Sequence, residues 1–162
     1  MDAKIGARLI NARGETLASK PAFREAFRQR RCLIPASGFY EWQEIPGSRM
    51  KQPHYVSLLS GELMTFAGLW ESWKSSDGEV VLTCTIVTTG ANQQLASLHD
   101  RMPAVLGHTD WNTWLDPDTD RKTLETLIRP YPADEIQIWP VSTRVNRAKE
   151  DSPDLIKALS PP

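Results

Sequence analysis

The sequence is poor in the residues that build covalent or metal-held frameworks. It has two cysteines and three histidines in 162 residues, and Cys32 and Cys84 show no metal-ligand spacing with any histidine. We therefore expect neither a disulfide nor a zinc site, and both thiols, set in apolar strand-like runs, are expected to be free and buried. No apolar run is long enough to cross a membrane, and the first residues lack the apolar core of a signal peptide. The sequence thus predicts a cytoplasmic protein with no cofactor, no metal and no membrane partner.

The sequence also lacks an excess of charge of either sign, because its formal net charge is −1. This balance conceals an asymmetry: residues 1–32 carry eight basic and three acidic side chains, a net charge of +5, so the remaining residues carry −6. This basic segment, residues 1–32, is either a face that meets phosphates or, for Arg24, Arg28 and Arg30, a solvated helix face. Hydrophobic residues at 40% and charged residues at 24% are typical of a globular protein, and the length suits one domain with a single core.

The chain is organised around an apolar segment at residues 31–42, which a proline and a Ser-Gly turn signal interrupt. After the turn, residues 39–43 alternate as a half-buried strand does. Glu41 is flanked there by Tyr40 and Trp42, so we expect it to lie among aromatic side chains. Such a carboxyl is either a paired structural acid or a desolvated group whose raised pKa suits proton transfer near neutral pH.

Two other segments carry candidate functional side chains. Residues 8–13 have the pattern of an interior strand, so Asn11 and Arg13 share one face and can hold a polar ligand and a phosphate. In the alternative, the Asn11 amide is buried and bonded to the backbone, and Arg13 pairs with Glu15. His99 is expected at the end of a short helix over residues 91–98, where it is either structural or a catalytic acid and base.

The remaining pattern predicts further strands and helices joined by short connections, hence a mostly antiparallel sheet. Strands are expected over residues 54–59, 63–70, 80–89 and 136–142, and Pro140 marks the last as an edge or a bulge. Helices are expected from near residue 19 to near residue 30, and over residues 110–115, 120–128 and 152–162, the last ending in Pro161-Pro162. Trp111 and Trp114 are expected to pack in the core or an interface rather than to stack on bases.

Taken in order, five motifs resemble the SOS response-associated peptidase (SRAP) family, whose members shield abasic sites in single-stranded DNA by cross-linking to them. The motifs are Asn11-Ala12-Arg13-Gly14-Glu15-Thr16, Arg31-Cys32-Leu33-Ile34-Pro35, Gly38-Phe39-Tyr40-Glu41-Trp42, Leu98-His99-Asp100-Arg101-Met102-Pro103, and Trp139-Pro140-Val141-Ser142 with Val145-Asn146. The resemblance runs from about Ala7 to Ile156. It implies an α+β fold, a mixed, mostly antiparallel, curved, barrel-like sheet flanked by helices, here as a single SRAP-like domain over residues 1–162.

The resemblance also implies roles for individual residues. Asn11, Glu41 and His99 take catalytic positions, and Arg13 and Arg101 are the candidate contacts to the DNA backbone. The implied activity belongs to the DNA-damage (SOS) response: covalent, thiazolidine-type linkage of an N-terminal cysteine to abasic sites in single-stranded DNA. Peptidase-type removal of the protein's own N-terminal residue accompanies it. The protein is expected to be nucleoid-associated when bound to DNA.

The sequence departs from the family pattern at its start. Position 2 is Asp2 where the family has its nucleophilic cysteine, and the chain begins where the family's Asn-Ala-Arg strand begins. We therefore expect the family's first strands to be missing and cross-linking to be lost in this form. Apolar residues around Leu9, Ile10 and residues 80–87 are then expected to be uncovered.

Three other functions are weighed against the family activity. A non-covalent single-stranded DNA binder would use Arg13, Arg101 and the basic segment of residues 1–32. It would not distinguish abasic from intact strands. A thiol hydrolase would pair Cys32 with His99 and would require an exposed thiol. The last alternative is an inert fragment.

Overall fold

The computed structural model of the chain describes residues 6 and 9–159, which form two compact units that alternate along the sequence. One unit comprises the residues up to Pro35 together with Thr65–Gly90 and Met102–Tyr131. The other comprises Ala36–Met64, Ala91–Arg101 and the residues from Pro132 onward. We call them the five-strand unit and the three-strand unit. The predicted strand start at Arg8 and the predicted Pro161-Pro162 end of the tail lie outside the described residues.

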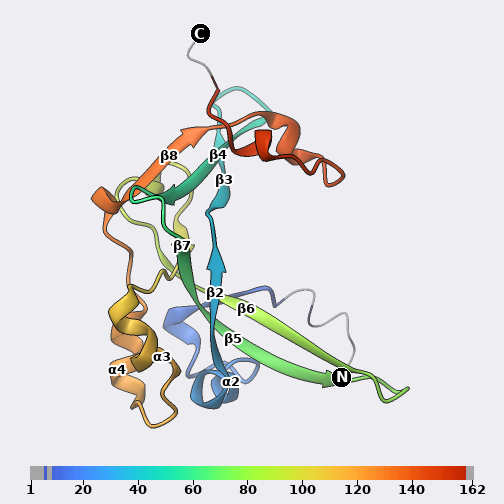
Figure 1. Ribbon diagram of the computed structural model, residues 1–162, viewed down its shortest axis with the longest axis vertical. Coiled ribbons are helices and arrows are strands. Elements are labelled where there is room, and N and C mark those ends of the chain that lie inside the picture. Colours follow the sequence, from blue (N-terminus) through green and yellow to red (C-terminus); the bar gives the residue numbers. More distant parts are fainter. Residues whose placement is uncertain (1–5, 7–8, 160–162) are drawn as a thin grey trace. The chain divides into compact units, whose positions relative to one another are not determined.

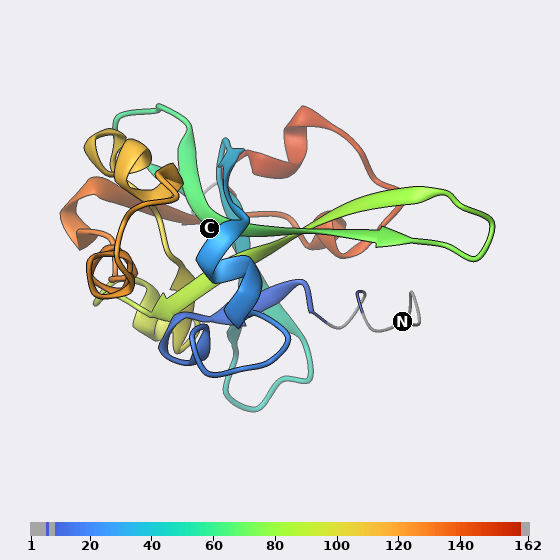
Figure 2. The ribbon, with the colours of Figure 1, turned by 90° about the horizontal axis from the view of Figure 1, so that it is seen from below.

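The five-strand unit holds nearly all of a mixed sheet. Its strands lie in the order β1 (Asn11–Arg13), β6 (Val80–Gly90), β5 (Met64–Lys74) and β2 (Arg31–Ala36), and β7 (Arg101–Pro103) also pairs with β6. The pair β1–β6 is parallel, whereas β5 and β6 form an antiparallel hairpin. Figure 1 shows the hairpin as two long strands side by side, and in Figure 2 it extends away from the blue helix α2.

The described part of this unit also contains the short helices α2 (Arg24–Gln29), α3 (Trp111–Leu115) and α4 (Arg121–Leu127). The Asp120 carboxylate accepts from the backbone N–H of Thr123 at 3.1 Å, which confirms the expected N-cap of α4. Apolar side chains from the sheet and the helices share one core, which includes Ala12, Leu17, Phe27, Leu69, Val87, Trp114 and Leu124. Trp114 is fully buried, so its predicted role in packing is confirmed.

The three-strand unit is built on an antiparallel sheet. Its strands lie in the order β3 (Phe39–Glu44), β4 (Lys51–Leu58) and β8 (Ile136–Pro140). Pro140 ends the edge strand β8, as predicted, because proline has no N–H to donate to a further strand. The tail forms a short 3-10 turn over Pro153–Ile156, and the indole N–H of Trp139 donates to the Ile156 carbonyl at 2.7 Å.

The predicted α+β class and mostly antiparallel pairing are confirmed. Within the described ranges the strands form two sheets, and neither closes into a barrel. Residues 91–98 form only a 3-10 turn at Leu95–Ser97, so the predicted helix there is wrong. The single-domain organisation stays a prediction. In the part of the chain that the structure describes, no helix is both long and apolar enough to span a membrane.

Candidate active site

Glu41 lies in the middle of β3, in the three-strand unit. It stands opposite His54 of β4 in the antiparallel register, so the two side chains project from the same face of the sheet. Gly38, just before β3, makes this pairing possible. A Cβ at position 38 would lie 2.3 Å from the Val56 carbonyl oxygen, so any side chain there would push the two strands apart. The Ser-Gly turn signal therefore has a steric reason.

The expectation that Glu41 lies among Tyr40 and Trp42 is wrong in one respect. Neighbouring residues of a strand project from opposite faces, so these two rings lie on the other side of β3 from the carboxylate. That face carries an aromatic row, with ring centroids 5.2 Å apart for Tyr40 and Tyr55 and 5.3 Å apart for Tyr55 and Trp139. The aromatic row thus lies on the opposite face of the sheet from Glu41 and His54.

Burial raises the pKa of the half-buried Glu41 carboxyl above its ordinary value. Asp100 adds to this rise by repulsion, whereas His99, the backbone N–H of Trp42 and Lys51 oppose it. Desolvation is the largest of these effects, so a larger share of Glu41 is protonated near neutral pH than of an exposed glutamate. Of the two interpretations drawn from the sequence, these contacts favour the desolvated carboxyl over the paired structural acid.

His99 follows the 3-10 turn, and its imidazole contacts two neighbours through the same nitrogen. Nδ1 lies 3.0 Å from the backbone N of Arg101 and 3.1 Å from Oδ1 of Asp100. In the neutral ring Nδ1 accepts from the Arg101 N–H, which places the proton on Nε2; in the charged ring Nδ1–H donates to Asp100 instead. The His99 side chain is half exposed.

The other predicted site residues divide between the two units. Arg101 is half-buried and belongs to the same unit as Glu41 and His99. Asn11 and Arg13 lie on β1 of the five-strand unit, where both are exposed and flank the buried Ala12. Their predicted position on one face of a strand is confirmed, although the strand begins at Asn11 rather than earlier.

Two contacts of β3 were not predicted from the sequence. His54 faces Glu41 across β3 and β4, and its Nδ1 lies 3.1 Å from the Gln52 carbonyl oxygen. Asn146 accepts through Oδ1 from the indole N–H of Trp42 at 2.7 Å, which ties β3 to the segment after β8. Only the Val145-Asn146 motif gave a signal for the second contact.

The cysteines differ from the expectation. Cys84 is exposed rather than buried, while Cys32 is half-buried. Burial and, secondarily, Cys84 raise the pKa of the Cys32 thiol, which lowers its thiolate fraction near neutral pH. These properties disfavour Cys32 as the nucleophile of a thiol hydrolase. Among the described residues, no group of three or more His, Cys, Asp or Glu side chains is placed to hold a metal ion.

The model of the family described as SOS response associated peptidase (SRAP) matches residues 1–148 of the chain. The abasic site processing protein YoqW of Bacillus subtilis (strain 168) is 44% identical over 158 residues, which cover 97% of this chain and 70% of that protein. The abasic site processing protein HMCES of Rattus norvegicus is 31% identical over 172 residues, covering 90% and 48% respectively. A crystal structure of a protein from Bacteroides thetaiotaomicron superposes with a TM-score of 0.89 at 25% identity, covering 95% of this chain and 67% of that one.

Proposed function

The chain belongs to the SOS response associated peptidase family, and we propose that it takes part in processing abasic sites in single-stranded DNA during the DNA-damage response. The relatives named above are abasic site processing proteins, which supports this target. In this proposal, residues of the chain supply the acid, the base and the DNA contacts of a covalent linkage between protein and abasic sugar. The peptidase-type activity in this proposal is removal of the protein's own N-terminal residue.

The observation that carries the proposal is the pair of titratable groups in the three-strand unit. Burial raises the pKa of the Glu41 carboxyl, and His99, in the same unit, lies near enough to oppose this rise. A carboxyl and an imidazole close together can serve as the acid and the base of a proton-transfer reaction. A surface carboxylate with no catalytic role would not need this environment.

The proposed chemistry assigns one proton transfer to each group. The abasic sugar is mostly a closed hemiacetal; His99 takes the proton from its C1′ hydroxyl group while water protonates the ring oxygen, so the C1′–O4′ bond breaks and the aldehyde forms. A primary amine then adds to the aldehyde carbon, and the carbinolamine loses water to form an imine. Protonated Glu41 donates the proton that leaves with this water and recovers it in the reverse direction. Asn11 orients the amine through its amide.

The DNA contacts are assigned to two arginines. A guanidinium matches the geometry of a phosphate and stays charged, so Arg13 and Arg101 are each suited to contact the DNA backbone. The exposure of Arg13 on β1 supports this role. Each phosphate contact adds about one charge equivalent to the salt dependence of binding.

The nucleophile of the covalent step is assigned to a cysteine with a free α-amine, whose thiol closes a thiazolidine ring on the imine. Position 2 of this sequence is Asp2, and Cys32 and Cys84 lie within β2 and β6, where their backbone nitrogens are in peptide bonds. A polypeptide of residues 1–162 is therefore expected to bind abasic DNA without forming a linkage that survives heat and denaturant. An inert fragment would not bind abasic DNA at all.

The test has two stages, read on a denaturing gel with an oligonucleotide that carries one abasic site. The 162-residue polypeptide should give no stable protein–DNA band, whereas the same polypeptide preceded by a segment with an N-terminal cysteine should give one. In the extended protein, Glu41→Gln and His99→Ala should each slow linkage by about 10²- to 10⁴-fold.

The matched controls are Glu44→Gln, at the exposed end of β3, and His108→Ala, which stacks on Trp111 in the other unit. Both should link at the parent rate. If Glu41→Gln and His99→Ala also link at the parent rate, the assigned roles are wrong. Binding that is equally tight to intact and abasic strands would instead support the non-covalent DNA binder.

A further inference from the structure

His54 lies on β4 of the three-strand unit and has no role in the chemistry proposed above. It is half-buried and stands directly opposite Glu41 in the register of β3 and β4. Directly opposite residues of an antiparallel pair project from the same face, with Cβ atoms about 5 Å apart. The imidazole of His54 is therefore a cross-strand neighbour of the Glu41 carboxyl.

One ring nitrogen of His54 is fixed by the main chain. Its Nδ1 lies 3.1 Å from the carbonyl oxygen of Gln52. A carbonyl oxygen only accepts hydrogen bonds, so Nδ1 must carry a proton to make this contact. In the neutral ring, Nε2 is then left with a free lone pair, and His54 gains its second proton at that atom.

The same contact turns the ring of His54 toward β3. The Val141 N–H donates to the Pro53 carbonyl at 2.9 Å, so this carbonyl points to the side of β4 on which β8 lies. Successive carbonyls of a strand point in opposite directions, so the Gln52 carbonyl points to the side of β3. A ring bonded to that carbonyl leans toward the strand that carries Glu41.

His99 has the opposite arrangement of its ring nitrogens. Its Nδ1 lies 3.0 Å from the backbone N of Arg101, so in the neutral ring Nδ1 accepts and Nε2 carries the proton. His99 therefore gains its second proton at Nδ1, which lies 3.1 Å from Oδ1 of Asp100. The two histidines of this unit thus accept a proton at different ring nitrogens and can serve different steps of a reaction.

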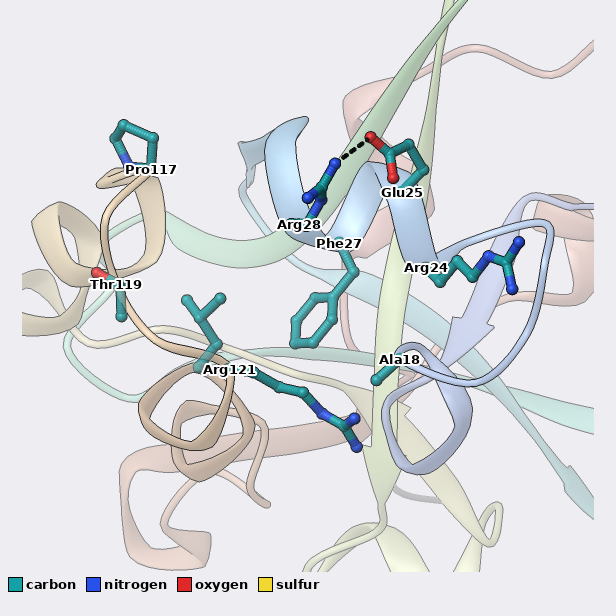
Figure 3. A pocket seen from close by; sticks show the side chains of 9 residues that line it. Ala18, Arg24, Glu25, Phe27, Arg28, Pro117, Thr119 and Arg121 are labelled. Atoms are coloured by element: carbon teal, nitrogen blue, oxygen red, sulfur yellow. Dashed lines mark hydrogen bonds and ion pairs between the residues drawn. The ribbon is translucent and has the colours of Figure 1, made fainter.

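Glu41 is suited to be the acid that works opposite such a base. A glutamate and an arginine in contact neutralise each other's charge, as Glu25 and Arg28 do at 3.1 Å in the five-strand unit (Figure 3). In the part of the chain that the structure describes, no arginine or lysine forms an ion pair with Glu41: Lys51 acts on it electrostatically but pairs with Glu44 at 3.0 Å. An acid without a fixed cation and a base with a free lone pair therefore face each other across two strands.

We propose that His54 is the base that activates the amine nucleophile of the linkage, an inference that rests on the proposed function. Nε2 takes one proton from the ammonium group, and the freed nitrogen lone pair forms a bond to the aldehyde carbon of the opened sugar. As the C=O π bond breaks, the oxygen takes the proton of Glu41, and the nitrogen gives one of its protons to the resulting carboxylate. The product is a neutral carbinolamine beside a protonated Glu41, which is the species that the loss of water requires.

The first experiment determines the tautomers of the two histidines in the 162-residue polypeptide without DNA. Long-range proton–nitrogen NMR spectra show which ring nitrogen is protonated, and the loss of signals in His54→Phe and His99→Ala assigns them. Neutral His54 should carry its proton on Nδ1, and neutral His99 should carry it on Nε2. A neutral His54 with its proton on Nε2 would overturn the proposal, because that atom would have no lone pair to accept a proton.

The second experiment measures the pH dependence of linkage in the cysteine-extended protein at saturating abasic DNA. Imidazoles change charge near neutral pH, and His54, His99, Asp100 and Lys51 all lie near Glu41, so only variants separate their contributions. His54→Phe keeps a ring of similar size and should slow linkage about 10²-fold near neutral pH. Its remaining rate should increase with pH until the amine itself loses its proton. His108→Phe, the matched control in the other unit, should keep the parent rate and profile.

The third experiment separates a base from a structural side chain. Imidazole added to the buffer should accelerate linkage by His54→Ala in proportion to its concentration, because it supplies the missing lone pair, and should not accelerate His108→Ala. A cooperative thermal transition shows that the variants are folded. A folded His54→Ala that is slow and gains nothing from imidazole would show that His54 only supports the sheet.

Glu41→Gln, measured beside these variants, distinguishes the failure of this inference from that of the proposed function. If Glu41→Gln slows linkage while His54→Phe keeps the parent rate and pH profile, the assignment of His54 is wrong and the proposed function stands. If neither variant slows linkage, both proposals are wrong.

Discussion

At the scale of the residue, the raised pKa of Glu41 predicts a pH-dependent effect on stability. The group titrates at a higher pH in the folded than in the unfolded chain, whose ordinary value is 4.5. Its stabilising contribution is present below that ordinary value and is lost as the pH rises through the raised folded value. Glu41→Gln removes this ionisation, so the free energy of unfolding of the variant relative to the parent should increase between pH 4 and pH 8.

Denaturant unfolding at several pH values measures this difference directly. Glu44→Gln, on the same strand but with a side chain 83% exposed, should show a difference that varies less with pH. If Glu41→Gln follows the same pH dependence as Glu44→Gln, the carboxyl is not desolvated in the folded protein and cannot serve as an acid near neutral pH.

The two thiols should differ in reactivity. Cys84 is exposed, whereas burial both shields Cys32 and raises the pKa of its thiol. A short pulse of iodoacetamide at neutral pH, read by peptide mass spectrometry, should therefore label Cys84 well before Cys32. The Cys84→Ser variant should remain almost unlabelled during the same pulse. Rapid labelling of Cys32 in that variant would restore the thiol hydrolase as a candidate.

At the scale of the element, Arg31 is expected to be the most sensitive charged residue of the five-strand unit. Its four carbonyl contacts join the ends of α2 and α3. Lysine keeps the charge but lacks the guanidinium geometry, so Arg31→Lys should lower the free energy of unfolding by about 3 kcal/mol. Arg28→Lys, at an exposed pair with Glu25, should change it by less than about 0.5 kcal/mol. If Arg31→Lys lowers the free energy of unfolding by less than about 1 kcal/mol, the guanidinium contacts between α2 and α3 are dispensable.

The elements also show how far the sequence predicts the fold and the site. The alternation of apolar and polar residues and the content of β-branched residues predicted the strands well. Both patterns arise because one or both faces of a sheet are buried. In residues 91–98, the Asn92 side chain accepts from the Leu95 N–H at 3.0 Å as an N-cap does, but the turn ends at Leu98 and is too short for an α-helix. Strand register was beyond prediction, since the loop over residues 45–50 leaves the pairing of Glu41 with His54 undetermined.

At the scale of the whole molecule, the β5–β6 hairpin has an apolar face that stays exposed. Leu82 is 70% exposed and Val80 58%, and both project from the same face as Trp70, as the register of β5 and β6 requires. The expectation of uncovered apolar residues in this strand is thereby confirmed. Exposed apolar strands favour association between copies of a chain.

Self-association through this face should be visible by sedimentation or light scattering as a mass that increases with protein concentration. Leu82→Lys should shift the association to concentrations about tenfold higher or more. Thr83→Lys places the same charge on the opposite face and should have a smaller effect. A parent protein that is monomeric at all concentrations would show that the exposed face is tolerated in solution.

The parallel pairing of β1 with β6 has a consequence for synthesis on the ribosome. The hydroxyl of Thr88 donates to the carbonyl of Ala12, 76 residues earlier, so β1 cannot dock until the β5–β6 hairpin has left the exit tunnel. Contacts at such a separation form slowly, because a long loop must close before any pairing energy is gained. The strand that carries Asn11 and Arg13 therefore reaches its folded position only after residues 80–90 have been synthesised.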